Sequence, residues 1–228
     1  MLKQRKRGNM KKYLGALKKC PLFAGVDEAD ITAMLSCLNA KEVRTKKNEV
    51  VFAAGDRPEY VGIVLEGSVH IVQEDYWGNR MILAAIEAGG IFGEAFSCAE
   101  TAVLPVSVLT HDSGAVLLID CRKILTTCSS ACLFHARLIR NLMKILANKN
   151  IALTRKMEHV TKKTTRDKVL SYLSECALTE GTNSFTIPFN RQELADYLSV
   201  ERSALSNTLC KMRDEGSIWF EKNKFRML

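Results

Sequence analysis

The stretch N-R-Q-E-L-A-D-Y-L-S-V-E-R-S-A-L-S-N-T-L-C-K, residues 190–211, decides the fold of this chain. Its apolar residues repeat at helical spacing twice. The first group is Leu194, Ala195 and Leu198, and the second is Leu205, Leu209 and Met212. Only residues 199–201 lie between the two predicted helices, so a tight turn must join them. Two short helices joined in this way form a helix-turn-helix unit.

The outward face of the second predicted helix carries Arg202, Ser203, Ser206 and Asn207. These side chains can hydrogen-bond to base edges and to phosphates. The alternative is an ordinary helical hairpin inside a core. The exposed face is polar without being simply rich in Glu and Lys, which favours nucleic-acid binding over that alternative.

The length and the charge distribution of the chain are consistent with a two-domain protein that binds a polyanion. The 228 residues provide room for two domains of common size, and 47% of them are hydrophobic, as in a chain that buries a core. The net charge is +8, yet residues 48–120 hold 2 Lys/Arg against 11 Asp/Glu, whereas residues 121–160 hold 8 against 1. A basic surface suits a polyanion. A charge distribution that serves solubility alone is the alternative.

Neither a membrane span nor a disulfide framework is indicated. No apolar run approaches the roughly 20 residues that cross a bilayer, and the apolar run behind the basic start is too short for a signal peptide. We therefore expect a cytoplasmic protein. Its eight cysteines contain no C-x-x-C, so free thiols are expected. Cys128 and Cys132 share one helical face, which leaves a redox or metal role open for that pair.

Between residues 41 and 120 the pattern changes to short β-rich runs separated by turn signals. Many short strands at this spacing predict a small antiparallel barrel or jelly roll. Side chains should alternate between the two faces within residues 68–72. The predicted strands are residues 50–52, 60–65, 68–72, 81–86, 102–109 and 115–119.

Residues 89–96 read G-G-I-F-G-E-A-F, and here the chain resembles the cyclic-AMP receptor/FNR (Crp/Fnr) family of bacterial transcription regulators. The resemblance extends over residues 20–228. It implies an α+β protein with a cyclic-nucleotide-binding-like β-roll, a long dimerisation helix and a C-terminal winged helix-turn-helix. In the family, a Gly-Glu opening binds the cyclic phosphate and ribose. The positions that match this effector pocket are Gly93, Glu94, Ala95 and Phe96.

The chain departs from the cyclic-AMP binders of that family about ten residues later. Leu104 and Pro105 stand where those proteins place Arg and Ser or Thr. Leu cannot pair with a phosphate, Pro has no N–H to donate, and burying a phosphate without a counter-charge is unfavourable. No Lys or Arg lies between Arg80 and Arg122. We therefore predict an unknown effector other than cyclic AMP, or a roll that serves only as a scaffold.

Other cofactors are not expected. The iron–sulfur members of the family use a cluster of N-terminal cysteines, whereas only Cys20 and Cys37 lie in that region here. Two distant thiols cannot supply four ligands, so no iron–sulfur cluster is expected. No closely spaced Cys/His set indicates a dedicated metal site. Haem ligation by one of the four histidines stays open.

Residues 121–160 predict a short helix followed by a long one, with Ser129 or Ser130 as its cap. Leu138, Leu142, Ile145 and Ala152 form a coiled-coil-like stripe, which the family resemblance assigns to pairing of two subunits. Packing of the stripe on the chain's own roll is the alternative. Residues 159–163 are the expected hinge.

The C-terminal residues complete a winged helix-turn-helix, because a short strand precedes the two helices and a basic hairpin follows them. We expect domains at residues 1–120 (sensor roll with N-terminal helices), 121–160 (dimerisation helix and hinge) and 161–228 (DNA binding). Arg202 is the candidate for guanine and Asn207 for adenine. Ser203 and Ser206 could reach bases or phosphates. Backbone contacts are expected from Arg191, Gln192 and Lys211.

The predicted function is that of a dimeric, sequence-specific transcription regulator and not of an enzyme. Its partners would be an imperfect palindrome in double-stranded DNA, a second subunit and, by the family resemblance, RNA polymerase. Alternatives are a regulator that needs no effector and a cupin-like enzyme. A cupin-like enzyme needs His and Glu metal ligands clustered on strands, whereas His70 and His111 stand alone, which disfavours the enzyme.

Overall fold

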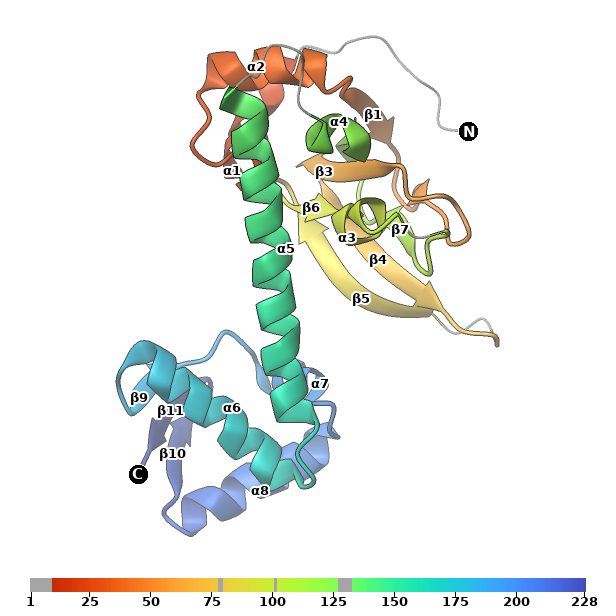
Figure 1. Ribbon diagram of the computed structural model, residues 1–228. Helices are drawn as coiled ribbons and strands as arrows, with labels where there is room; N and C mark the ends of the chain where they lie inside the picture. The colour runs from red at the N-terminus through yellow and green to blue at the C-terminus, as the bar shows by residue number, and fades with distance from the viewer. Residues whose placement is uncertain (1–9, 78–79, 101, 127–132) are drawn as a thin grey trace. The chain divides into compact units, whose positions relative to one another are not determined.

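The computed structural model describes residues 10–77, 80–100, 102–126 and 133–228. The chain folds as two compact units, Met1–Ala147 and Asn148–Leu228 (Figure 1). The dividing point lies inside the long helix α5, Leu133–Val160. Ser129, Ser130, Cys128 and Cys132, to which the sequence assigned a helix cap and an open redox role, lie outside the described residues. No helix among the described residues is long and apolar enough to cross a membrane.

The N-terminal unit begins with helices and continues as a roll of two antiparallel sheets. The described residues form four-stranded sheets in the orders β1-β8-β3-β6 and β2-β7-β4-β5. The helices are η1 (Met10–Tyr13), α1 (Leu14–Lys19), η2 (Pro21–Phe23), α2 (Glu28–Cys37), α3 (Glu94–Cys98) and α4 (Cys121–Leu125). The strands are β1 (Lys41–Thr45), β2 (Val50–Phe52), β3 (Tyr60–Glu66), β4 (Ser68–Glu74), β5 (Arg80–Glu87), β6 (Ile91–Phe92), β7 (Ser107–Thr110) and β8 (Gly114–Asp120).

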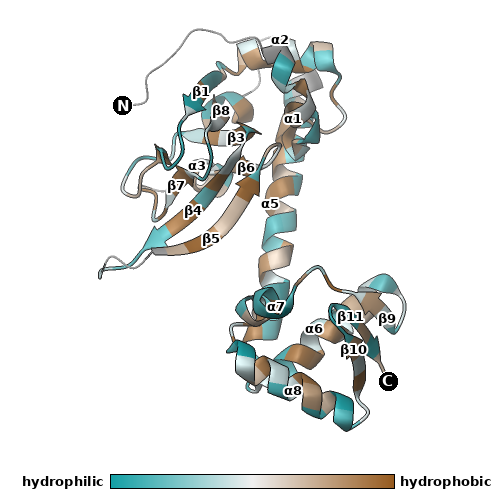
Figure 2. Cartoon of the chain, turned by 180° about the vertical axis from the view of Figure 1, so that it is seen from behind, coloured by the Kyte–Doolittle hydropathy of each residue, from teal (hydrophilic) through white to brown (hydrophobic). Residues whose placement is uncertain are grey.

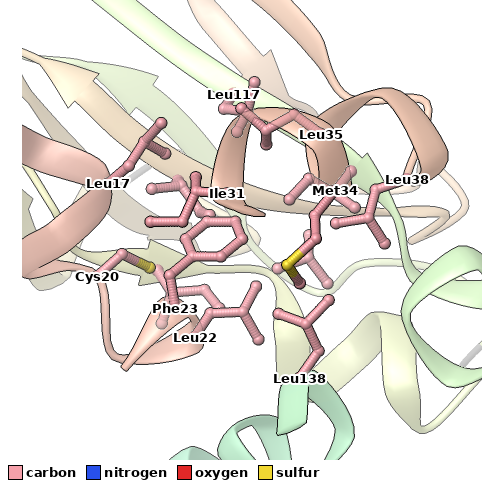
Figure 3. Close-up of a cluster of buried hydrophobic side chains, with 14 of the residues drawn as sticks. Leu17, Cys20, Leu22, Phe23, Ile31, Met34, Leu35, Leu38, Leu117 and Leu138 are labelled. Carbon is pink, nitrogen blue, oxygen red and sulfur yellow. The ribbon is translucent and has the colours of Figure 1, made fainter. Parts of the chain in front are cut away.

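Two cores hold the N-terminal unit, and the period of the strands creates both. Successive side chains of a strand point to opposite faces of its sheet. On β3, Val61 and Ile63 join the core beneath the helices, while Val64 joins the core that includes side chains of both sheets. Figure 3 shows the helical core, in which Leu138 of α5 lies with Met34 and with Leu117 of β8. The first turns of α5 therefore belong to the packing of this unit.

Three details of the roll differ from the sequence prediction. The predicted strand at residues 102–109 is wrong in its first half, since β7 begins at Ser107. The predicted alternation fails at Ile71/Val72, where a β-bulge shifts the register between β4 and β5, so Val69 and Val72 are both buried. Strands β1 and β6 were not predicted, because β1 is rich in charged residues and β6 is very short.

The C-terminal unit is a winged helix-turn-helix. Helix α6 (Thr165–Glu180) precedes β9 (Ser184–Thr186), α7 (Arg191–Leu198) and α8 (Arg202–Asp214), and the wing is β10 (Ile218–Glu221) with β11 (Lys224–Met227). The three strands pair in the order β10-β11-β9. Leu194, Leu198, Leu205, Leu209 and Met212 are all fully buried in one core. The predicted helix-turn-helix pattern is thereby confirmed.

The last turn of α5 is attached to α6 within this unit. His159 is buried, and its ring is hydrogen-bonded to Ser171 Oγ at 2.9 Å and to Glu175 Oε2 at 2.6 Å. Arg155 Nη1 lies 3.1 Å from Glu175 Oε1. Since buried polar groups with partners hold their elements in one arrangement, the residue at the start of the predicted hinge is firmly anchored.

Candidate nucleic-acid interface

Helix α7 starts at a complete capping box, which supports the helix-turn-helix from its first residue. Asn190 Oδ1 accepts hydrogen bonds from the backbone N–H groups of Gln192 and Glu193, and the Glu193 carboxylate accepts one from the Asn190 N–H. Such reciprocal bonds satisfy N–H groups that a helix start leaves unpaired. The signal for this cap in the sequence is the Asn-x-x-Glu spacing of Asn190 and Glu193, which was not among the predicted features.

The turn between α7 and α8 is held by backbone and side-chain contacts. Ser199 takes the left-handed conformation with φ of 52°, and the Val200 N–H donates to the Ala195 carbonyl at 3.0 Å. Lys168 Nζ of α6 donates to the carbonyls of Leu198 and Ser199, both at 3.3 Å. A cation at the end of α7 also complements the negative end of its dipole. The turn that aims α8 is therefore fixed both by its own backbone and by α6.

The start of α8 presents a polar surface to solvent. Arg202, Ser203, Asn207 and Lys211 are exposed and Ser206 is half-buried, while Leu205 and Leu209 on the opposite face are buried. Figure 2 shows this division as teal and brown residues along α8. A hollow of about 460 Å³ is lined by Glu201, Arg202, Ser203 and Ser206. Four of the predicted contact residues thus lie on one open face, together with Lys211 further along the helix.

Glu201 belongs to this hollow, although the sequence analysis did not select it. It stands at the N-cap position of α8, and its carboxylate accepts a hydrogen bond of 2.8 Å from Ser203 Oγ. A carboxylate repels phosphate, and it can accept a hydrogen bond from cytosine N4. Its position directly before the helix was the available signal.

Arg191 and Gln192, the predicted backbone contacts of α7, already have partners in the chain. The Arg191 guanidinium lies 5.0 Å from the centre of the Phe220 ring, and its Nη2 donates to the Lys222 carbonyl at 3.4 Å. Burial lowers the pKa of Arg191 below its usual value. Gln192 donates to Asp196 at 2.9 Å on the exposed side of α7. Arg191 therefore connects α7 to the wing.

The residues of the candidate effector segment differ widely in exposure. Glu94 and Leu104 are buried, with 2% and 4% of their surface exposed, whereas Ala95 and Pro105 are exposed and Phe96 is half-buried. The Leu104 N–H donates to the Asp56 carbonyl at 2.8 Å, and the Gly55 N–H donates to the Leu104 carbonyl at 2.9 Å. Leu104, which the sequence analysis predicts to stand at the place of the family's Arg, is thus a buried apolar residue.

Gly93 has a structural reason to be glycine. Its φ is 77°, in the left-handed region, and an added Cβ would lie 2.9 Å from the Phe52 ring and 3.2 Å from the Tyr60 carbonyl oxygen. Close packing of α3 against the roll requires glycine there even without a ligand. No group of three or more His, Cys, Asp or Glu side chains suited to a metal ion occurs among the described residues.

The stripe assigned to dimerisation is used largely within one chain. Leu138, Leu142 and Ile145 are buried in the helical core of the N-terminal unit, and Ala152 is exposed. These three side chains therefore follow the alternative that the sequence left open, in which the stripe packs within its own chain. The same helix exposes Met143, Leu153 and Met157, each by more than 60%.

Two domain families match the chain. The cyclic nucleotide-binding domain matches residues 42–130, and the Crp-like helix-turn-helix domain matches residues 167–228. No curated protein matches by sequence.

Solved structures share the fold at low identity. The catabolite activator protein of Thermus thermophilus is 20% identical over 91% of this chain and 93% of its own, with a TM-score of 0.50. The c-di-GMP-responsive global regulator CLP of Xanthomonas campestris is 19% identical over 88% of this chain and 99% of its own, with a TM-score of 0.55. These likenesses establish the fold, a roll followed by a long helix and a winged helix-turn-helix.

Proposed function

Because the chain belongs to the Crp/Fnr family of transcription regulators, we propose that it binds operator DNA as a homodimer, with α8 of each subunit in a major groove. The observation that supports this most strongly is the exposed polar face of α8 above an apolar face that is completely buried. In helix-turn-helix dimers the two half-sites lie about one helical turn apart, roughly 34 Å. The expected operator is an imperfect palindrome.

Base reading is proposed for the first two turns of α8. Arg202 has the geometry for a bidentate contact with guanine, and Asn207 for one with adenine. Glu201 would accept a hydrogen bond from cytosine, with Ser203 and Ser206 completing the surface. Gln192 and Lys211 would contact phosphates, which add affinity without sequence information. Arg191 supports the wing, whose exposed Lys222 and Lys224 extend the basic surface.

Dimerisation is proposed through the exposed side of α5 instead of the stripe first assigned to it. The residues are spaced alternately by three and four positions, as in the a and d positions of a coiled coil. Asn150 lies at a central a position, where a polar residue specifies register and oligomer state. The proposed seam consists of Met143, Leu146, Asn150, Leu153 and Met157, of which Leu146 is half-buried and also packs against the helical core of its own unit.

The roll is proposed to respond to a ligand other than cyclic AMP. Leu104 is buried where a phosphate-binding Arg would stand, and residues 81–121 contain no Lys or Arg. A cyclic phosphate would enter without a counter-charge, which is strongly unfavourable. An uncharged, largely apolar effector fits this environment better.

Thermal unfolding with and without cyclic AMP tests the ligand proposal. A site with micromolar affinity would stabilise the protein by about 4 kcal/mol at a 1,000-fold excess over Kd. We expect no change in the melting temperature. A clear, saturable rise would contradict the proposed role of Leu104.

A second candidate is a regulator that needs no effector, because packing alone accounts for Gly93 and Leu104. Native mass spectrometry of the purified dimer separates the two candidates when it is combined with operator binding. A co-purified small molecule that operator binding requires supports an effector. Full operator binding by protein of the bare dimer mass supports the scaffold role. RNA polymerase remains the proposed partner in either case.

DNA binding itself is tested by competition. An operator selected from random duplexes is compared with a duplex of the same composition in which the half-sites are scrambled. Specific complexes typically exceed non-specific ones by at least about 10³-fold at physiological salt. Equal affinities for the two duplexes would contradict sequence-specific binding by α8.

A further inference from the structure

Two free thiols from distant parts of the sequence meet in the N-terminal unit. Cys98 Sγ, at the end of α3, lies 3.3 Å from Cys121 Sγ, at the start of α4, and the two helices are in contact. Cys98 is half-buried, whereas Cys121 is buried. A disulfide joins its sulfurs at about 2.05 Å, so the two atoms need to approach by only about 1.2 Å.

The two thiols differ in their chemistry. The hydrogen bond from Cys121 lowers the pKa of Cys98, although burial and the charge of Glu94 act in the opposite direction. The same contact, together with burial, raises the pKa of Cys121. Because the thiolate is the nucleophile, the more accessible Cys98 is suited to attack and the buried Cys121 to resolve the product.

We propose that Cys98 and Cys121 form a redox-responsive dithiol, which a hydroperoxide converts into an intramolecular disulfide. Cys98 sulfur attacks one peroxide oxygen, the O–O bond breaks, and a sulfenic acid and one water form. Cys121 sulfur then attacks Cys98 sulfur, the S–O bond breaks, and the thiol proton leaves with the hydroxide as a second water. Two thiols and one hydrogen peroxide thus give one disulfide and two waters, and two electrons pass from sulfur to oxygen.

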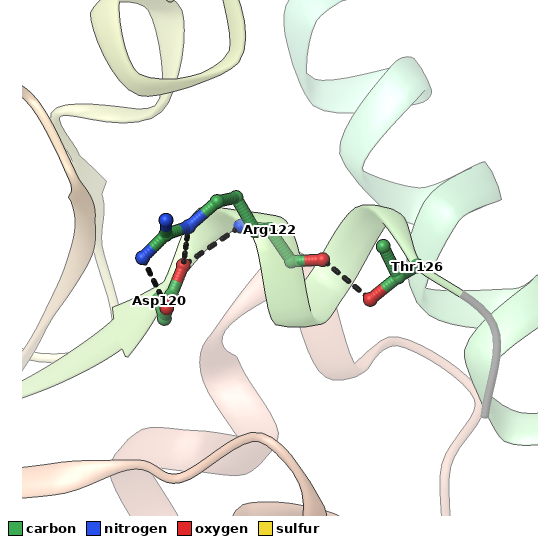
Figure 4. A network of polar contacts seen from close by, with 3 residues as sticks. All are labelled: Asp120, Arg122 and Thr126. Atoms are coloured by element: carbon green, nitrogen blue, oxygen red, sulfur yellow. Dashed lines mark hydrogen bonds and ion pairs between the residues drawn. The ribbon is translucent and has the colours of Figure 1, made fainter.

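Hydrogen bonds within α4 and its cap stabilise that helix. Asp120 accepts hydrogen bonds from the Arg122 backbone N–H at 3.0 Å and from the Arg122 guanidinium (Figure 4). Thr126 Oγ1 donates to the Arg122 carbonyl at 2.7 Å, at the other end of the helix. Closing the sulfur distance would draw the end of α3 and the start of α4 together and strain the bond of 2.8 Å from Ser97 Oγ to the Tyr60 carbonyl.

This movement affects the segment that carries the candidate effector residues. Helix α3 starts directly after Gly93, so a change at Cys98 reaches the same five-residue helix. Oxidation is therefore expected to alter the state of the roll. Transmission from the roll to the operator rests on the proposed function.

Peptide mapping tests the chemistry without any DNA. The full-length protein is treated with a small excess of hydrogen peroxide, remaining thiols are alkylated, and the digest is analysed without reduction. We expect a peptide pair joined through Cys98 and Cys121, which dithiothreitol separates. Formation of Cys98 sulfinic acid, an unoxidised pair, or bonds from either residue to other cysteines would overturn the proposal.

Cys98→Ser removes the attacking sulfur, and Cys176→Ser in the C-terminal unit is the matched control. We expect the first variant to lose the cross-link and the second to keep it. Circular dichroism establishes that both variants fold. If Cys98→Ser is unstable, Cys98→Ala and the wild-type map decide the question.

Operator affinity tests the regulatory consequence. We expect oxidised and reduced wild-type protein to differ by at least about fivefold in Kd, within the usual range of coupling between sites. Cys98→Ser should bind the operator equally with and without peroxide. A mapped disulfide with unchanged operator affinity would overturn the regulatory role while leaving the chemistry intact. Failure of reduced protein to bind any operator would instead contradict the proposed function.

Discussion

Helix α8 and helix α3 each begin where a ligand is expected, and their surroundings are opposite. The start of α8 exposes Arg202 and Ser203 around an open hollow. The start of α3 has a buried Glu94 and belongs to a candidate pocket in which Leu104 is buried. A surface for a polyanion has to leave its donors and cations in solvent, whereas a packed apolar segment has neither to offer. The start of α8 therefore leaves polar side chains accessible to a ligand, whereas Glu94 and Leu104 in the roll are buried.

The largest effect is expected at Leu104 in the roll. Leu104→Ala should destabilise the N-terminal unit by about 2–5 kcal/mol, because it removes a buried side chain and leaves a cavity. Hydrogen exchange of the β8 amides measures this locally. Val103→Ala, at the exposed neighbour, is the control and should change little. If the Leu104→Ala protein is as stable as the wild type, the side chain of Leu104 is not packed, and the contrast with the exposed start of α8 is wrong.

The next effect concerns the proposed α5 seam, which would pair two subunits so that both α8 helices can bind one operator. Leu153→Glu should dissociate the dimer, since the seam would bring two carboxylates together and bury them. Sedimentation velocity measures the oligomeric state, and operator affinity should fall by at least about tenfold with the loss of the second half-site contact. Ile151→Glu, an exposed apolar neighbour off the seam, should remain dimeric. Dissociation of both variants equally, or of neither, would contradict the seam.

At the open site, Arg202→Ala should cost about 1–3 kcal/mol of discrimination at one base pair without loss of stability, because its side chain is exposed. Fluorescence anisotropy with operators altered one base pair at a time measures this. Lys211→Ala is the comparison variant and should weaken all duplexes alike and reduce the salt dependence. If Arg202→Ala weakens every duplex equally, Arg202 contacts phosphate only.

The smallest effect is expected from loss of the N-cap of α7. Asn190→Ala removes the cap and should cost about 1 kcal/mol of stability in the C-terminal unit. Denaturant unfolding followed by Trp219 fluorescence, in a Trp77→Phe background, reports on this unit because the chain has two tryptophans. Asn190→Ser, which keeps a capping oxygen, should restore most of the loss. A loss that Asn190→Ser does not restore would assign another role to Asn190.

The helix-turn-helix, the roll and the wing could all be predicted from the sequence, because each depends on a local period and on turn residues. The positions of Leu194 to Met212 follow from helical spacing alone. The wrong first half of the 102–109 strand has a tertiary cause, since Leu104 bonds to the turn at Gly55 and not to a neighbouring strand. Strand β1 escaped prediction because three of its five residues, K-E-V-R-T, are charged.

Contacts between distant residues account for what the sequence could not supply. The most apolar stripe of α5 was assigned to a partner, whereas Leu138 and Leu142 complete the chain's own core. The placement of Arg191 over Phe220 depends on the wing folding back onto α7. Strands β7 and β8 lie between Cys98 and Cys121 in the sequence, and no spacing rule joins the two thiols.

Selection of random DNA duplexes by the purified protein, with and without cyclic AMP, tests the central proposal most directly. The account predicts enrichment of one imperfect palindrome with half-sites about 10 base pairs apart, with the same sequence and the same affinity under both conditions. Enrichment that appears only with cyclic AMP would contradict the proposal that the roll responds to a ligand other than cyclic AMP or to none. Absence of any enriched sequence under both conditions would contradict sequence-specific DNA binding by α8.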